Sequence, residues 1–167
     1  MRTLPLVIFF SALSLFFMGC PYESAVPIDS PTAAKSDASL TGTWRDTTDD
    51  TYQYKVTLDG NMYNVSKKNI KEQSTPPTNY KGWLSDVSGS TFLNLYEVSD
   101  DGGDPKYYLY KVERVSDLVK LRAVTDNITE EFTTSADLKA YIKANMNLSF
   151  FYNKDDQKVL GVVRNGH

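Results

Sequence analysis

Apolar and polar residues alternate along most of the chain after Leu40. In the clearest run, over residues 52–58, a tyrosine or an aliphatic residue occupies every second position, with polar residues between. This period of two is typical of a β-strand with one buried face. Asp59-Gly60 follows, a dipeptide favoured in two-residue hairpin turns. The pattern therefore predicts a hairpin whose second strand begins at Met62.

The same signal recurs roughly every 10 to 14 residues, with Gly, Pro, Ser or Asp between the runs,. A polar stretch with Pro76-Pro77, from residue 67 to 78, is predicted to be a loop. This spacing predicts a mainly β fold, an antiparallel barrel or a sandwich. The further expected strands cover residues 80–87, 92–98, 106–115, 118–124 and 128–132, and a final pair covers 148–152 and 159–163.

One stretch near the C-terminal end has helical periodicity instead. Leu138, Tyr141, Ile142 and Met146 form a single apolar stripe at a spacing of three to four residues,. Thr134 is a good N-cap, with Asp137 three residues later as in a capping box. We expect one helix, ending near Asn145 and packed on the outside or across one end of the β-structure.

The N-terminal residues differ from the rest in being almost entirely apolar. Arg2 precedes an apolar run over positions 4–18 that is shorter than the about 20 residues of a membrane-spanning helix,. Gly19 and Cys20 close it, and Cys20 is the single cysteine of the chain. The segment resembles the signal peptide of bacterial lipoproteins, which implies removal of residues 1–19 and lipid attachment to the Cys20 sulfur. Membrane anchoring through this lipid is the expected consequence.

Residues 20–39 contain three prolines and no periodic pattern, and they are predicted to be a flexible tether ahead of a domain over 40–167,. The start Cys20-Pro-Tyr-Glu-Ser-Ala-Val-Pro is similar to that of small lipoproteins of the Bacteroidota. The residue after Cys20 is Pro21, rather than the aspartate that retains such proteins at the inner membrane. We therefore expect an outer-membrane location. Glu23 is a lone acidic residue near the anchor, where surface-exposed lipoproteins of the Bacteroidota tend to carry an acidic cluster, so we expect the periplasmic face, with the cell surface as the alternative.

Gly42-Thr43-Trp44, at the start of the first strand, resembles the opening of lipocalins and related calycin barrels. About eight meandering strands and one late helix agree with that resemblance. It implies an up-and-down β-barrel in which Trp44 plugs the closed end and Gly42 relieves crowding beside it. In the family an arginine covers the tryptophan ring, and Arg122 and Arg164 are both candidates here.

The resemblance also implies a cavity for a small apolar ligand inside the barrel. An eight-stranded barrel has room for side chains or for one small ligand. Aromatic residues that could line the wall are Tyr52, Tyr54, Tyr63, Trp83, Tyr96, Tyr108 and Tyr110. They could equally fill the interior, and the sequence leaves the two interpretations open.

Several chemistries lack their usual residues. The only histidine is His167, the last residue, so triad catalysis has no base within the fold,. With Cys20 expected to carry lipid, we predict no catalytic site, no metal site and no cofactor, and hence no enzyme. A net charge of −3 argues against nucleic acid as a partner,. The clusters Asp46/Asp49/Asp50 and Asp100/Asp101/Asp104 are interpreted as turns, and Lys67/Lys68/Lys71 as a solvated loop,.

Two functions remain compatible with the sequence. The first is a membrane-anchored envelope lipoprotein whose barrel binds a small apolar or amphipathic molecule. The second is a non-enzymatic structural or protein-interaction module with a filled barrel, including an inhibitor of another enzyme. A cavity of about 300 Å³ or more would favour the first function.

Overall fold

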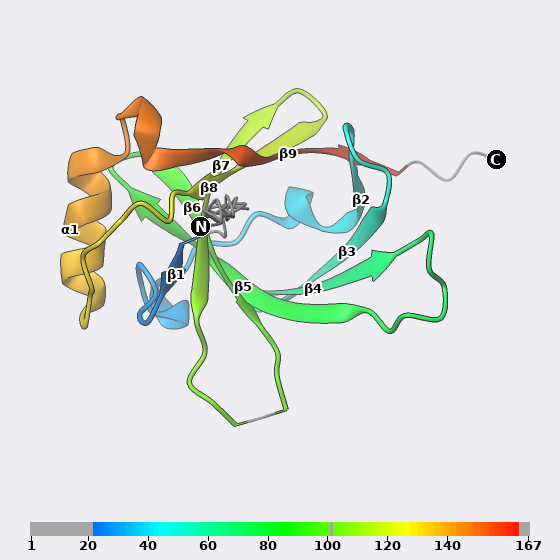
Figure 1. Ribbon diagram of the computed structural model, residues 1–167, viewed down its shortest axis with the longest axis horizontal. Helices are drawn as coiled ribbons and strands as arrows, with labels where there is room; N and C mark the ends of the chain where they lie inside the picture. Colours follow the sequence, from blue (N-terminus) through cyan, green and yellow to red (C-terminus); the bar gives the residue numbers. More distant parts are fainter. Residues whose placement is uncertain (1–21, 101, 164–167) are drawn as a thin grey trace, which may run out of the picture.

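The computed structural model describes residues 22–100 and 102–163 (Figure 1). The predicted signal peptide, Cys20 and Arg164 lie outside the described residues. The elements are β1 (Glu23–Ser24), η1 (Pro31–Ala33), η2 (Ala38–Leu40), β2 (Gly42–Asp46), β3 (Tyr52–Asp59), β4 (Met62–Asn69), β5 (Thr78–Val87), β6 (Ser90–Glu97), β7 (Tyr107–Val115), β8 (Leu118–Val124), α1 (Ser135–Asn145), η3 (Ser149–Phe151) and β9 (Tyr152–Val162).

Strands β2 to β9 form a closed antiparallel barrel in which each strand pairs with the next along the chain. The barrel closes where β9 pairs with β2, with Trp44 opposite Val162. This arrangement confirms the predicted mainly β, up-and-down barrel of eight strands with one late helix, and it is compatible with a lipocalin-like fold. Closure leaves the eight strands with no unpaired sheet edge along most of their length.

Two parts of the predicted strand pattern were wrong. Residues 128–132 form no strand, since the chain leaves β8 after Val124 and runs to the helix. The predicted pair over 148–152 and 159–163 is a single long strand, β9, preceded by the turn of η3. Asn153 and its polar neighbours suggested a turn, but they lie on a strand that pairs with β8.

Side chains of successive residues alternate between the inside and the outside of the barrel. On β6, Leu93 and Leu95 line the interior cavity, whereas Phe92 and Asn94 are fully buried on the outer face. A barrel wall buried on both faces needs a second layer outside it. Helix α1 and the residues before β2 supply that layer.

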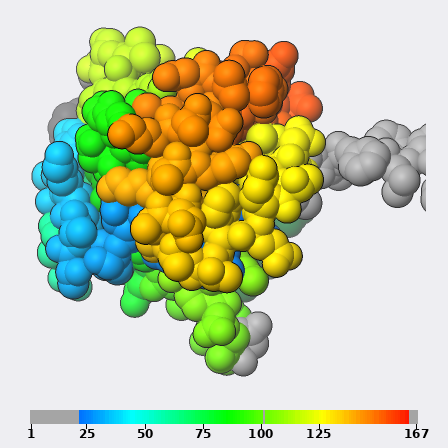
Figure 2. Space-filling model, turned by 90° about the vertical axis from the view of Figure 1, so that its left-hand side faces the viewer, coloured from blue at the N-terminus to red at the C-terminus, as the bar shows by residue number. Residues whose placement is uncertain are grey.

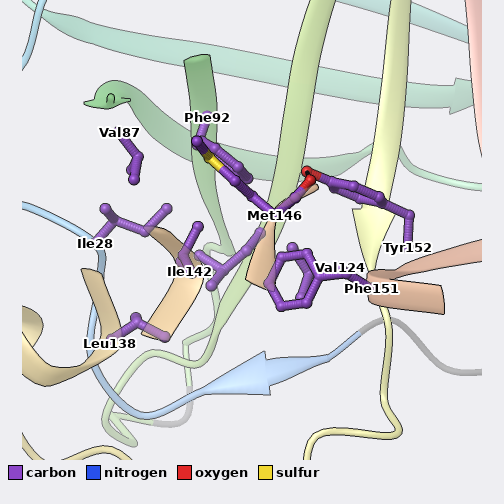
Figure 3. Close-up of a cluster of buried hydrophobic side chains, with 10 residues drawn as sticks. Ile28, Val87, Phe92, Val124, Leu138, Ile142, Met146, Phe151 and Tyr152 are labelled. Carbon is purple, nitrogen blue, oxygen red and sulfur yellow. Dashed lines mark hydrogen bonds between the residues drawn. The ribbon is translucent and has the colours of Figure 1, made fainter. Parts of the chain in front are cut away.

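Helix α1 packs against the outer face of the barrel, which is one of the two placements that the sequence predicted. The Thr134 side chain accepts a hydrogen bond from the Asp137 backbone N–H, which confirms the predicted cap. Leu138 and Ile142 are fully buried. Figure 3 shows them facing Ile28, Val87 and Phe92, in the larger hydrophobic core of the molecule. Tyr152 closes this core at the far side, where its hydroxyl donates to the Met146 carbonyl at 2.9 Å.

Residues 22–40, here called the N-terminal arm, contradict the prediction of a flexible tether over 20–39. Strand β1 of the arm pairs with the start of β7, and Ile28 is 0% exposed in the outer core. The Ile28 backbone N–H donates to Asn94 Oδ1 at 2.7 Å, and Asp29 forms a 2.8 Å ion pair with Lys139 of α1. Figure 2 shows the blue start of the arm beside the gold helix on this face.

The arm escapes a search for periodic patterns because its contacts are single residues at irregular spacing. Burial of one isoleucine contributes about 1.5–3 kcal/mol, and polar contacts add to this. The Trp83 indole N–H supplies one such contact by donating to the Asp29 carbonyl at 2.8 Å. The folded unit therefore starts near Tyr22 rather than at Leu40.

Candidate functional site: a cavity inside the barrel

The barrel encloses a cavity of about 430 Å³. That volume lies within the range of about 300–1,000 Å³ found for small-molecule sites. The interpretation in which tyrosines fill the barrel is therefore wrong for this part of the interior. The lining is mostly aliphatic and aromatic, from Leu40, Trp44, Tyr54, Val56, Tyr63, Val65, Tyr80, Leu84, Leu93, Leu95, Tyr108, Tyr110, Val112, Val119, Leu121 and Leu160.

One end of the cavity, here called the floor, is covered by the arm. Leu40 lines the cavity, and its carbonyl accepts a 2.9 Å hydrogen bond from the Trp44 indole N–H. The Tyr63 hydroxyl also bonds to the arm, accepting from the Asp37 N–H at 2.7 Å and donating to the Asp37 carbonyl at 3.0 Å. Trp44 is only 2% exposed. Its position in this closed end agrees with what the resemblance to lipocalins implies.

Gly42 is needed for a different reason than the resemblance implies. A Cβ at this position would lie 4.0 Å from Trp44 Nε1, which is ordinary contact distance. Its φ of +129° is the constraint, because residues with side chains rarely adopt that conformation,. Backbone geometry, rather than crowding beside the ring, therefore accounts for the glycine.

Arg122 does not cover Trp44. Its guanidinium lies 4.1 Å from the centroid of the Tyr152 ring, on the outer face of the barrel. This is a cation–π contact. Burial raises the pKa of Tyr152 to about 12, and the positive charge of Arg122 acts in the opposite direction. The other candidate, Arg164, lies outside the described residues.

Four of the seven predicted wall residues line the cavity: Tyr54, Tyr63, Tyr108 and Tyr110. Burial raises the pKa of both Tyr54 and Tyr110, so these phenols stay neutral across the physiological range,. Tyr80, which was not among the seven predicted wall residues, also lines the cavity; it lies three positions before Trp83 and therefore on the opposite face of β5,. Burial raises the pKa of Tyr80 to about 12.

Trp83 and Tyr96 were placed on the wrong face. They belong to an edge-to-face aromatic cluster with Tyr107, with the Trp83 and Tyr107 ring centroids 5.7 Å apart. Trp83 lies beneath the arm, to which its indole donates, and it does not line the cavity. Because even-numbered residues of β5 face inward, the odd-numbered Trp83 must face outward.

Tyr52 lies beside the cavity rather than in its lining. The Lys67 Nζ is 4.3 Å from the centroid of its ring. Lys67 was predicted to belong to a solvated loop with Lys68, but both residues lie on β4, and Lys67 faces the cavity. Only Lys71 of that group is in a loop, where it pairs with Asp50 at 2.6 Å.

The end opposite the floor, here called the mouth, is where the charged lining residues lie. β3 begins and β4 ends there, so Tyr52 and Lys67 are close to the rim. The charged side chains of the lining are Glu23, Lys67, Asp156 and Lys158. The site thus combines an apolar interior with a polar rim.

The acidic cluster Asp46/Asp49/Asp50 makes hydrogen bonds typical of turns, whereas Asp101 of the other cluster lies outside the described residues. Asp46 Oδ1 accepts from the Thr48 N–H and Asp49 Oδ1 from the Thr51 N–H, both at 2.9 Å. Within the described residues no group of three His, Cys, Asp or Glu side chains is placed to hold a metal ion. Among these residues, too, no helix has the length and apolar character needed to cross a membrane.

Comparison of the chain with protein-family models, with curated proteins and with solved structures finds no match.

Proposed function

We propose that this protein is a membrane-anchored envelope lipoprotein of the type found in Bacteroidota, whose barrel binds a small amphipathic molecule. The cavity of about 430 Å³ carries the ligand-binding part of the proposal. An apolar interior accommodates a hydrocarbon portion, and a few polar groups at the rim fix the orientation of a head group. The lipobox-like segment ending at Cys20 supports the anchor, and Pro21 supports the outer membrane.

The proposed role is binding rather than catalysis, without a metal or cofactor and without nucleic acid. A docking role toward another envelope protein is the second candidate. Five large apolar side chains are exposed among the residues that the structure describes, with Phe150 at 68% exposure, and such residues can contact a partner,. We rank this role second, because a lined cavity is a more specific feature than a set of separate exposed side chains.

Native mass spectrometry of the mature protein tests the proposal. Residues 20–167 with the Cys20→Ser substitution, exported behind a signal peptide that is cleaved without lipid attachment, would be purified from the periplasm without detergent. We expect a discrete additional mass that is lost on denaturation. A bare chain that also fails to take up added dodecanol would contradict ligand binding.

A further inference from the structure

The charged groups at the mouth differ in how they are partnered. Lys158 Nζ lies 3.0 Å from Asp156 Oδ1, so these two charges largely neutralise each other. Glu23 is exposed to solvent. Lys67 is half-buried, and within the described part of the chain no carboxylate oxygen lies within ion-pair distance of its ammonium.

An unpaired ammonium in this position costs free energy, because part of its hydration is lost without a compensating anion. Burial accordingly lowers the pKa of Lys67, with repulsion from Lys158 as the second cause. Asp156 and Glu97 act in the opposite direction but more weakly. The ring of Tyr52 offers Lys67 a cation–π contact, which replaces only part of the lost hydration,.

We infer that Lys67 binds the head group of the ligand, and that this head group is an anion, such as a carboxylate, on a single apolar chain. The inference rests on the proposed function, since it assigns the ligand class of the same cavity. The apolar chain would lie against Val65, Leu95 and Leu121, toward the floor. A cationic head group fits less well, because Asp156 is already paired and Glu23 is screened by water,.

Calorimetric titration of the mature Cys20→Ser protein with dodecanoate and with dodecanol tests this assignment. The two probes share one chain and differ in the charge of the head group. We expect tighter binding of dodecanoate, and a loss of about tenfold or more for dodecanoate alone in the Lys67→Met variant, as expected for one charge-assisted hydrogen bond. Lys67→Arg should retain the preference.

Lys68→Met is the matched control. Lys68 is the next residue of β4, exposed and outside the cavity lining, so its loss should change neither affinity. Equal affinity of the wild type for both probes, or an equal loss of both in Lys67→Met, would overturn the role of Lys67 and leave the proposed function standing. Failure of the wild type to bind either probe would instead contradict the proposed function itself.

The position of β1 carries a second, independent inference. Glu23 of β1 lines the cavity at the mouth, and the Tyr22 backbone N–H donates to the Val124 carbonyl at 3.3 Å. Tyr22 follows Cys20 by two positions, and an extended chain of that length spans at most about 7 Å. A lipid on Cys20 would therefore be held close to the mouth rather than at the end of a long tether.

Exposed apolar side chains occur at the same end. Phe150 and Leu148 lie just before β9, next to Val124, and Val98 follows the end of β6. Val115 and Val162 are exposed at the floor end, so apolar exposure alone does not set the orientation. We also infer that the mouth faces the bilayer when Cys20 carries lipid, and that the ligand enters directly from the membrane.

Site-directed labelling of the lipidated protein in phospholipid vesicles tests this orientation. Glu97→Cys places a fluorophore at the mouth, and Asn61→Cys places one in the β3–β4 turn at the floor; both residues are exposed. We expect iodide to quench the label at residue 61 and to quench the label at residue 97 much less. Equal quenching at both sites would overturn the orientation, whereas protein that does not bind vesicles would contradict the anchor.

Discussion

Single side chains decide whether the inside of this barrel is a cavity or a packed core. Tyr63 turns its hydroxyl to the arm at the floor, and Tyr54 and Tyr110 are neutral phenols in the wall. Aliphatic residues occupy most of the remaining inward positions and are too short to meet across the barrel. The aromatic residues therefore frame the cavity without filling it.

Lys67 should lower the stability of the protein at neutral pH. Because its pKa is lowered from 10.5 in the folded state, the folded protein binds fewer protons than the unfolded one in the window below 10.5,. The stability of the wild type relative to Lys67→Met thus rises as pH increases through that window. We expect urea unfolding at pH 7 to show Lys67→Met at least as stable as the wild type, with the difference shrinking toward pH 10. A variant that is clearly less stable at pH 7 would contradict this.

Gly82 lies where the barrel wall leaves no room for a Cβ. A Cβ there would lie 2.5 Å from the Asn94 carbonyl oxygen, and backbone cannot move aside cheaply. Gly82→Ala is expected to lower the free energy of unfolding by about 1–3 kcal/mol, measured by denaturant titration. Gly161→Ala is the control, because its Cβ would meet neighbours only at 3.5 and 3.6 Å. Similar losses in both variants would refute the assignment.

At the scale of elements, the strands and the helix follow from the sequence, and the arm does not. Alternation over β3 and the Asp59-Gly60 turn predicted the first hairpin, and Thr134 predicted the start of α1. These signals are local. The arm depends on contacts between residues far apart in the chain, such as Ile28 with Asn94, which no local pattern reports.

The candidate site was predicted only in part, and the rest was missed for the same reason. Alternation identifies which residues share a face, but it does not say which face turns inward when both are aromatic. Trp83 and Tyr96 were therefore assigned to the wall, although they form an aromatic cluster on the outer face, where the arm covers Trp83. Lys67 was assigned to a loop, because the polar end of β4 continues into a polar stretch that contains Pro76-Pro77.

Asn94 is expected to hold the arm on the barrel. Its amide is fully buried, with Oδ1 accepting from Ile28 N–H and Nδ2 donating to Ser85 Oγ at 2.9 Å and to the Trp83 carbonyl at 3.2 Å. Asn94→Ala leaves these groups unpaired, at a cost of about 1–3 kcal/mol.

Hydrogen exchange provides the measurement for Asn94. The amides of residues 26–30 should lose protection in Asn94→Ala and keep it in Asn79→Ala, where the side chain is exposed. Unchanged protection of the arm in Asn94→Ala would show that the arm is held by other contacts.

At the scale of the whole molecule, one segment serves two purposes. The arm covers the outer core with Ile28 and closes the floor with Leu40, while its first residues reach the mouth. The barrel is therefore sealed at one end and open at the end that β1 reaches. This arrangement suits the proposed amphipathic ligand, because its apolar portion would lie in the apolar interior and its charged portion at the polar rim.

Tryptophan fluorescence offers the most direct test that this cavity binds a ligand, because the two tryptophans of the chain lie on opposite sides of the barrel wall. Trp44 lines the cavity, and Trp83 lies outside beneath the arm. Titration of the mature Cys20→Ser protein with dodecanoate should give a saturable change that persists in Trp83→Phe and is lost in Trp44→Phe. A change that persists in Trp44→Phe, or no saturable change in Trp83→Phe, would contradict a ligand inside the barrel.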